Sequence, residues 1–298
     1  MFIQKQQNNM LAAGLIVFAT VFIAASSLLA KALGTGSFGP PLHALQISHG
    51  RFVFAWIVML AFFLALRPKL TAPHWPLHVA RTTCGWGGVT LMFAAVAYIP
   101  LSDATAISFL NPVFAMMLAI PLLGERVGPI RWTAAGMALL GALILLRPTP
   151  ASFEPAALLA LGAACVMGLE LIFIKQLARR EGPFQILIIN NTVGLVLASL
   201  AVIAVWQPPT GAQWFALVGV GLMMAAAQAC FINGMARADA SFVAPFSYAT
   251  LIFAVLYDAL FFNVLPDAIS WLGAVIIIAG AVLLALREGR LKTQKTRS

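Results

Sequence analysis

Long apolar stretches dominate the sequence and leave very few folds open to it. A membrane helix needs about 20 mostly apolar residues, and ten stretches of roughly that length follow one another along the chain. Lipid offers no partners to backbone N–H and C=O groups, so only helices or a closed barrel can cross it, and runs this long exclude a barrel. The sequence therefore predicts an all-α integral membrane protein with ten transmembrane helices. Their approximate limits are 10–33, 43–66, 77–98, 101–123, 129–147, 155–178, 184–206, 212–236, 240–263 and 268–287.

The charged residues support this interpretation and set the predicted orientation. Only 9% of the residues are charged and 62% are hydrophobic, whereas a soluble domain has about 25% charged residues. With the N-terminus inside, fifteen Lys and Arg residues fall at the cytoplasmic side of the ten spans and two at the outer side, while Arg51 lies within the second span. Cytoplasmic loops carry such an excess. The net charge of +9 is therefore explained by the topology of a membrane protein. The predicted partner is the lipid bilayer, and no nucleic acid is expected. Both termini are predicted to be cytoplasmic.

An internal repeat divides the chain into two related halves. The segment 101–147 has an imperfect copy at 238–287, in which the Asp-Ala-Thr of the first becomes Asp-Ala-Ser and an Ile-x-Trp-x-x-Ala pattern recurs. Such self-similarity has to be settled before the fold. Each half, 1–150 and 151–298, holds five predicted spans, an odd number, so the second half enters the membrane inverted. Two inverted five-helix repeats are a construction used by secondary transporters.

Particular residues of both halves resemble a known family. The run FLNP at 109–112, LGER at 123–126 and Trp132, with APFSY at 244–248 and LPD at 265–267 in the second half, resembles the EamA-type repeat of the drug/metabolite transporter superfamily. The resemblance covers nearly the whole chain and implies a ten-helix transporter of small organic molecules in a bacterial inner membrane. Within the superfamily the chain looks most like exporters of aromatic and other large neutral amino acids. The alternative is a transporter of another metabolite or a drug, possibly an importer.

A pocket for a large neutral side chain needs aromatic walls and a few placed polar groups. The third, fourth, eighth and ninth spans offer such groups near bent or glycine-rich helix, and the predicted substrate-binding residues are Trp86, Asn111, Gln228, Ser247 and Tyr248.

Two prolines are predicted to bend the helices beside this pocket. Pro112 and Pro245 fall inside their spans, where each removes a backbone hydrogen bond. Bent helices in corresponding halves point to the binding site of a transporter.

Ionisable residues within spans are costly and usually face the bundle interior. Glu170 and Asp258 are candidates for coupling transport to an ion, or else for pairing with a neighbouring charge. Arg51 is either a fixed structural charge or the group that captures a substrate carboxylate, for which a guanidinium is well suited. Lys31, near the outer interface, is expected to snorkel to the headgroups, and Asp103 to cap its helix.

Enzymes, channels and metal proteins are less consistent with the sequence. It has no GxSxG, HExxH or nucleotide-binding loop, and the inverted repeat argues against a channel. Its three cysteines form no CxxC pair, so neither a zinc site nor a disulfide framework is indicated. We expect no enzymatic activity, no cofactor and no metal, and a monomer that acts on a small-molecule substrate.

Overall fold

In the computed structural model, all regular secondary structure in the described part of the chain is helical. This part comprises residues 9–68, 70–123, 154–177, 180–235 and 249–295, with scattered positions between 129 and 144. No strand occurs in these ranges. In chain order the elements are α1 (Asn9–Gly34), α2 (Ala44–Leu66), α3 (Trp75–Val96), α4 (Leu101–Ser108), α5 (Asn111–Leu123), α7 (Ala157–Leu177), α8 (Pro183–Val202), the 3-10 turn η1 (Ile203–Val205), α9 (Gly211–Met235), α11 (Ala249–Phe262) and α12 (Ala268–Lys295).

The predicted all-α fold with apolar helices of membrane-spanning length is confirmed for the described residues, and the arrangement of ten spans in two inverted repeats stays a prediction. Among the described residues, six helical segments are long and apolar enough to cross a membrane, and α11 and part of α12 are shorter apolar helices. α2 and α9 begin and end within two residues of the predicted spans, because apolar length sets where a helix leaves the lipid. The predicted span 129–147 lies mostly outside the described residues, as does the first part of the span 240–263.

The predicted fourth span is divided into two helices. α4 ends at Ser108 and α5 begins at Asn111. At the junction the N–H groups of Phe109 and Leu110 donate to the carbonyls three residues earlier, Ala106 and Ile107, at 3.1 and 3.0 Å. Pro112 is the second residue of α5, where a missing N–H is readily tolerated.

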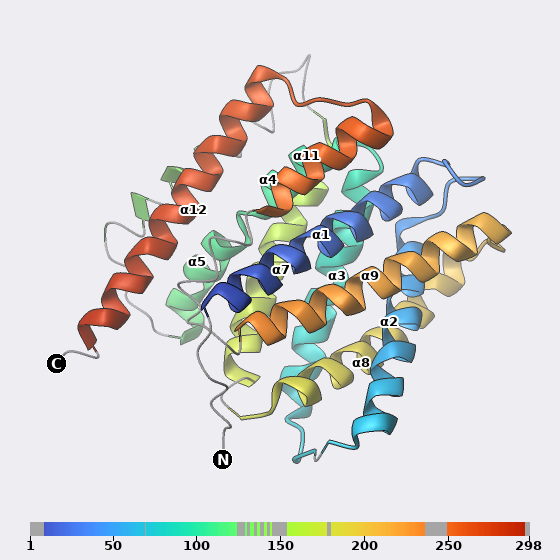
Figure 1. The fold of residues 1–298 in the computed structure, drawn as a ribbon, viewed down its shortest axis with the longest axis horizontal. Helices are drawn as coiled ribbons and strands as arrows, with labels where there is room; N and C mark the ends of the chain where they lie inside the picture. Colours follow the sequence, from blue (N-terminus) through green and yellow to red (C-terminus); the bar gives the residue numbers. More distant parts are fainter. Residues whose placement is uncertain are drawn as a thin grey trace.

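Two extensive antiparallel contacts organise the bundle. α1 lies along α9, and α3 lies along α7 (Figure 1). Small residues permit this close approach: a Cβ added at Gly88 of α3 would lie 2.5 Å from Met167 Cγ of α7. α2 packs against α8 and α9, while α12 lies at one edge of the bundle and contacts α4.

The bundle has two ends, which we name after a residue at each. At the Lys31 end, α1 and α3 finish and α4 begins. At the Glu181 end, α3 begins, α7 ends and α8 begins.

Candidate functional site

Three charged side chains lie together inside the bundle, two of them buried and the third, Glu170, partly buried. Arg51 of α2 and Arg81 of α3 are 5% and 6% exposed. Glu170 of α7 places its Oε1 atom 3.4 Å from Arg81 Nε and also interacts electrostatically with Arg51. We call Arg51, Arg81 and Glu170 the charge cluster. Because buried charge in a membrane bundle is expensive and usually functional, the cluster is the first place to look for a substrate site.

The two arginines of the cluster are held very differently. Arg81 donates from Nη1 to the carbonyl of Ile186 at 3.1 Å and faces Glu170, so its position is fixed. Arg51 stacks on the ring of Phe52, with 4.4 Å between its Cζ atom and the ring centroid. Its Nε and Nη1 atoms are buried and find no hydrogen-bond partner among the described residues. A buried donor without a partner costs about 1–3 kcal/mol, and more when the group is charged. Arg51 therefore has hydrogen-bonding capacity that the described residues leave unused.

Trp86 of α3 lies at about the same depth in the bundle as Arg51 of α2. Thr90 of α3 donates to Ser48 of α2 at 2.8 Å, which fixes the register of the two antiparallel helices. Arg51 follows Ser48 by three residues and Trp86 precedes Thr90 by four, and such spacings keep residues on one helix face. Both therefore lie about one turn, roughly 5 Å, further from the Lys31 end. Trp86 Nε1 is also buried without a partner among the described residues.

Glu170 fits into a space that a glycine leaves open. A Cβ added at Gly85 would lie 2.8 Å from Glu170 Oε1 and 2.9 Å from its carboxyl carbon, closer than real Cβ contacts. Gly85 immediately precedes Trp86, so the carboxylate lies against the backbone of α3 in the turn that carries the indole. The charge cluster and Trp86 together comprise one carboxylate, two guanidinium groups and one indole N–H without a partner among the described residues, and they come from three helices.

A buried ion pair joins three helices at the Lys31 end. Lys31 Nζ lies 2.5 Å from Asp258 Oδ1 and 4.3 Å from the centroid of the Phe262 ring. The other oxygen of Asp258 accepts from the backbone N–H of Ser102 at 3.0 Å. Asp258 is fully buried and Lys31 is 7% exposed. The expectation that Lys31 snorkels to the headgroups is therefore wrong, because the ammonium finds a carboxylate inside the bundle; for Asp258, the pairing alternative holds.

Asp103 does not cap its helix as expected. α4 begins at Leu101 after Pro100, so Asp103 lies within the first turn, and its Oδ2 atom accepts from Ser270 Oγ of α12 at 3.3 Å. Asp258 of α11 instead supplies the acceptor for the N–H of Ser102 at this helix start.

A second network, made of hydrogen bonds around Glu181, lies at the Glu181 end of the bundle. Glu181 accepts from the backbone N–H of His74 at 2.7 Å and from Gln185 Nε2 at 2.6 Å, and it lies 2.7 Å from His78 Nε2. Gln185 Oε1 in turn accepts from the backbone N–H of Thr71 at 2.7 Å. Burial alone would raise the pKa of the Glu181 carboxyl, but the hydrogen bonds from His74, His78 and Gln185 outweigh it and place the pKa below its ordinary value.

The structure brings some predicted pocket residues near this site and leaves others undescribed. Trp86 lies at the cluster. Gln228 of α9 accepts from Asn191 Nδ2 of α8 at 3.3 Å. The carbonyl of Asn111 lies near Gly168 of α7, two residues from Glu170. The remaining two, Ser247 and Tyr248, lie outside the described residues, as does Pro245, the predicted helix bend of the second half.

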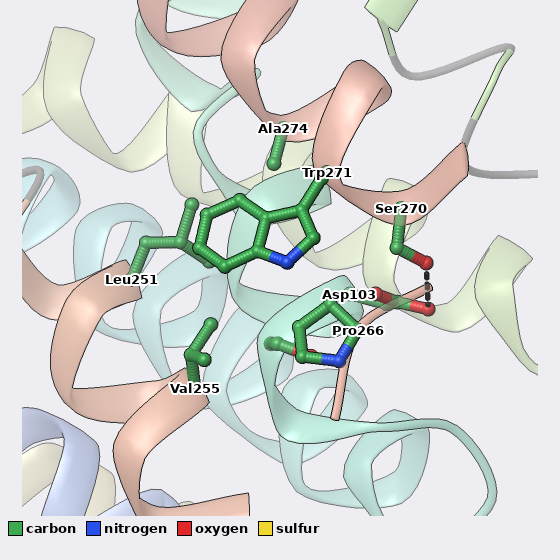
Figure 2. Close-up of a pocket in the computed structure, with 8 residues that line it drawn as sticks. Asp103, Leu251, Val255, Pro266, Ser270, Trp271 and Ala274 are labelled. Carbon is green, nitrogen blue, oxygen red and sulfur yellow. Dashed lines mark hydrogen bonds between the residues drawn. The ribbon is translucent and has the colours of Figure 1, made fainter. Parts of the chain in front are cut away.

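One small pocket lies at the Lys31 end between α4, α11 and α12 (Figure 2). Its lining includes Asp103 and Ser270, whose hydrogen bond Figure 2 draws as a dashed line, and the indole of Trp271. The cavity volume of about 10 Å³ is space for one water at most. It cannot hold an organic substrate.

Arg81, His78 and Glu181 were not recognised from the sequence as parts of a site. Arg81 was assigned to the cytoplasmic side as one of many topology-setting charges, but it lies buried in α3. The available signal was the four-residue spacing from Arg81 to Gly85, which places both on the helix face that meets Glu170.

Comparison with known proteins decides the family. A model of the EamA-like transporter family matches residues 10–147 and again residues 154–286. The chain belongs to the EamA-like transporter family. The superfamily resemblance seen in the sequence is thereby confirmed, and the charge cluster is a feature of a membrane transporter.

Three relatives from this superfamily are described as transporters of different compounds. A riboflavin transporter of Vibrio cholerae serotype O1 is 32% identical over 83% of each chain. An S-adenosylmethionine uptake transporter of Rickettsia bellii is 26% identical, over 95% of this chain and 96% of its own. A pseudopaline exporter of Pseudomonas aeruginosa is 25% identical, over 70% and 75%. Among solved structures, one crystal structure at 25% identity matches with a TM-score of 0.62, over 94% of this EamA-like chain and 98% of the other.

Proposed function

We propose that this protein is a secondary transporter that takes a small organic metabolite across the bacterial inner membrane by alternating access. The observation that carries the proposal is the 32% identity to a riboflavin transporter over 83% of both chains, together with the S-adenosylmethionine uptake transporter that matches almost end to end. These relatives favour the alternative stated from the sequence, another metabolite and possibly import, over export of large neutral amino acids. The pseudopaline exporter keeps the direction of transport a matter for experiment.

The packing of the helices supports two inverted repeats, 1–150 and 151–298. If the first and sixth predicted spans correspond, and the third and eighth, then the contact of α1 with α9 has its counterpart in the contact of α7 with α3. Likewise the contact of α1 with α11 corresponds to that of α7 with α5. All four contacts are extensive. Halves related in this way can exchange conformations and so open the same site to either side.

Each end network joins one half of the chain to the other. Lys31 and Ser102 belong to the first half and Asp258 to the second. At the other end, His78 belongs to the first half and Glu181 to the second. In the proposed cycle, one network opens while the other stays closed, and the charge cluster between them meets alternate sides. The Lys and Arg distribution supports a cytoplasmic position for the Glu181 end and for both termini.

Uptake into proteoliposomes containing the full-length protein tests this function. The labelled compounds are riboflavin, S-adenosylmethionine and phenylalanine, and liposomes without protein serve as the control. We expect riboflavin or S-adenosylmethionine to be taken up well above the control, and phenylalanine not. Movement of phenylalanine alone would return the protein to amino-acid transport, and movement of none of the three would refute the proposal for metabolites of this kind.

A further inference from the structure

We propose that Arg51 is the anchor for a carboxylate of the transported metabolite, and that Glu170 is the resident carboxylate with which this substrate group competes. The inference rests on the proposed function, because the ligand is taken to be the cargo. It assigns a chemical class to the cargo: an organic compound that carries a carboxylate, and this carboxylate enters the charge cluster.

The charges around Arg51 leave it without a carboxylate of its own. α2 packs against α1, α3, α8 and α9, and the sequence of these four helices contains no Asp or Glu. The acidic side chain that does reach Arg51 electrostatically is Glu170 of α7, which lies against Arg81 at 3.4 Å. Two guanidinium groups and one carboxylate give the cluster one surplus positive charge, and a bound carboxylate would neutralise it.

Free hydrogen-bond donors at the cluster match such an anion. Arg51 offers Nε and Nη1, and Trp86 offers Nε1, all buried and without partners among the described residues. Buried polar groups are normally satisfied, so each exception asks for an explanation. Three hydrogen-bond donors at one depth offer nothing to a cation, because a cation is bound by acceptors. An arginine binds the planar oxygens of a carboxylate with strong, directional hydrogen bonds, and the Phe52 ring beneath Arg51 fixes the plane of its guanidinium.

Glu170 offsets one of the two positive charges of the charge cluster. Its carboxylate lies in the space left by Gly85, one residue from Trp86, within reach of Arg81 and in the field of Arg51. An incoming carboxylate meets this negative charge at short range. The substrate anion is therefore bound most tightly when Glu170 remains on Arg81 or loses its charge, which makes Glu170 a determinant of affinity rather than a contact for the cargo.

A matched pair of ligands tests the anchor directly. Indole-3-acetate and indole-3-acetamide share one aromatic body and differ in the negative charge. Their binding to the purified full-length protein is measured as a ligand-dependent rise in melting temperature. We expect the carboxylate to bind at least about tenfold more tightly than the amide, and Arg51→Gln to remove this difference, since hydrogen bonds to charged groups are worth roughly tenfold to a hundredfold in affinity.

Variants on the same helices serve as controls. Arg67→Gln removes a positive charge from the exposed end of α2 and should leave the preference for the carboxylate intact. Arg51→Lys keeps the charge but loses the planar fork, and should weaken the preference several-fold even if Arg51→Gln does not fold. Glu170→Gln should strengthen carboxylate binding several-fold. Equal binding of acid and amide to the parent protein, or a preference unchanged in the Arg51 variants, overturns the anchor.

The two proposals fail separately. If the carboxylate is preferred through Arg51 but no metabolite is taken up, the site stands and the transport function does not. If riboflavin, which has no carboxylate, is taken up and Arg51→Gln transports it at the parent rate, the transport function stands and the anchor is refuted. Support for both would appear as uptake of S-adenosylmethionine, which carries a carboxylate, with an apparent affinity at least about tenfold lower in Arg51→Gln.

Discussion

Replacing Asp258 by Asn tests the ion pair that joins α1, α4 and α11. The substitution keeps the shape and an acceptor for the N–H of Ser102, but it removes the negative charge beside Lys31. The ammonium, 7% exposed, then remains buried with only the ring of Phe262, at 4.3 Å, to stabilise it. A cation–π contact is worth about 0.5–2 kcal/mol, whereas removal of one partner of a buried pair costs about 3–5 kcal/mol.

We therefore expect Asp258→Asn to lower the free energy of unfolding by about 3 kcal/mol. For a chain of this size that corresponds to a fall in melting temperature of roughly 6–12 °C. The assay is thermal unfolding of the detergent-purified protein. Glu154→Gln is the matched control, because it removes one carboxylate charge at an exposed position and should change stability by no more than about 0.5 kcal/mol.

A double variant decides whether the orphaned ammonium is the cause. Lys31→Met combined with Asp258→Asn removes both charges, and replacing a buried pair by uncharged groups is often neutral. The double variant should therefore recover at least about 2 kcal/mol relative to Asp258→Asn alone. A double variant as unstable as the sum of its single substitutions would refute the reasoning, because the two side chains would then contribute independently.

Three further predictions follow from other contacts. Gly85→Ala should displace the Glu170 carboxylate, 2.8 Å from the added Cβ, and change the affinity for the transported compound, as measured in uptake; unchanged uptake would show that Glu170 is not confined there. The pKa of the Glu181 carboxyl is lowered on folding, so the stability that its ionised form contributes is fully present above the unfolded pKa of about 4.3 and is lost as the pH falls through the lower folded pKa. Glu181→Gln should therefore make the melting temperature depend less on pH in the acid range. A melting temperature that falls with acid as steeply as in the parent protein would contradict this. Trp86→Phe should leave stability within about 1 kcal/mol, since its N–H has no partner to lose, yet weaken carboxylate binding, and a large loss of stability would show that the indole is bonded after all.

The positions of the helices were predictable, because each depends on a local property. The length of an apolar run decides where a helix enters and leaves the lipid, so α2 and α9 match their predicted spans to within two residues. The break in the fourth span lies at Phe109 and Leu110, two residues before Pro112, the proline expected to bend it.

The pairing of charges was not predictable, because it depends on contacts between distant parts of the chain. Lys31 and Asp258 are 227 residues apart, and nothing in either local sequence indicates the other. The bias of basic residues toward the cytoplasm gives the side of the membrane but not the depth, so Arg81 was counted with the loop charges although it is buried in α3. For Arg51, the sequence left a structural and a substrate-binding role open, and its missing partners could be seen only once the neighbouring helices were placed.

α4 and α5 form one predicted span and both pack on α7, but they differ in their other contacts. α4 is tied to α11 through Asp258 and also packs on α12. α5 lies against α7, where the Asn111 carbonyl oxygen would be 2.8 Å from a Cβ added at Gly168. A continuous helix would make α11 and α12 move together with α5. Because the N–H groups of Phe109 and Leu110 donate to carbonyls three residues earlier instead of four, we expect any change in the angle between α4 and α5 to occur at that joint.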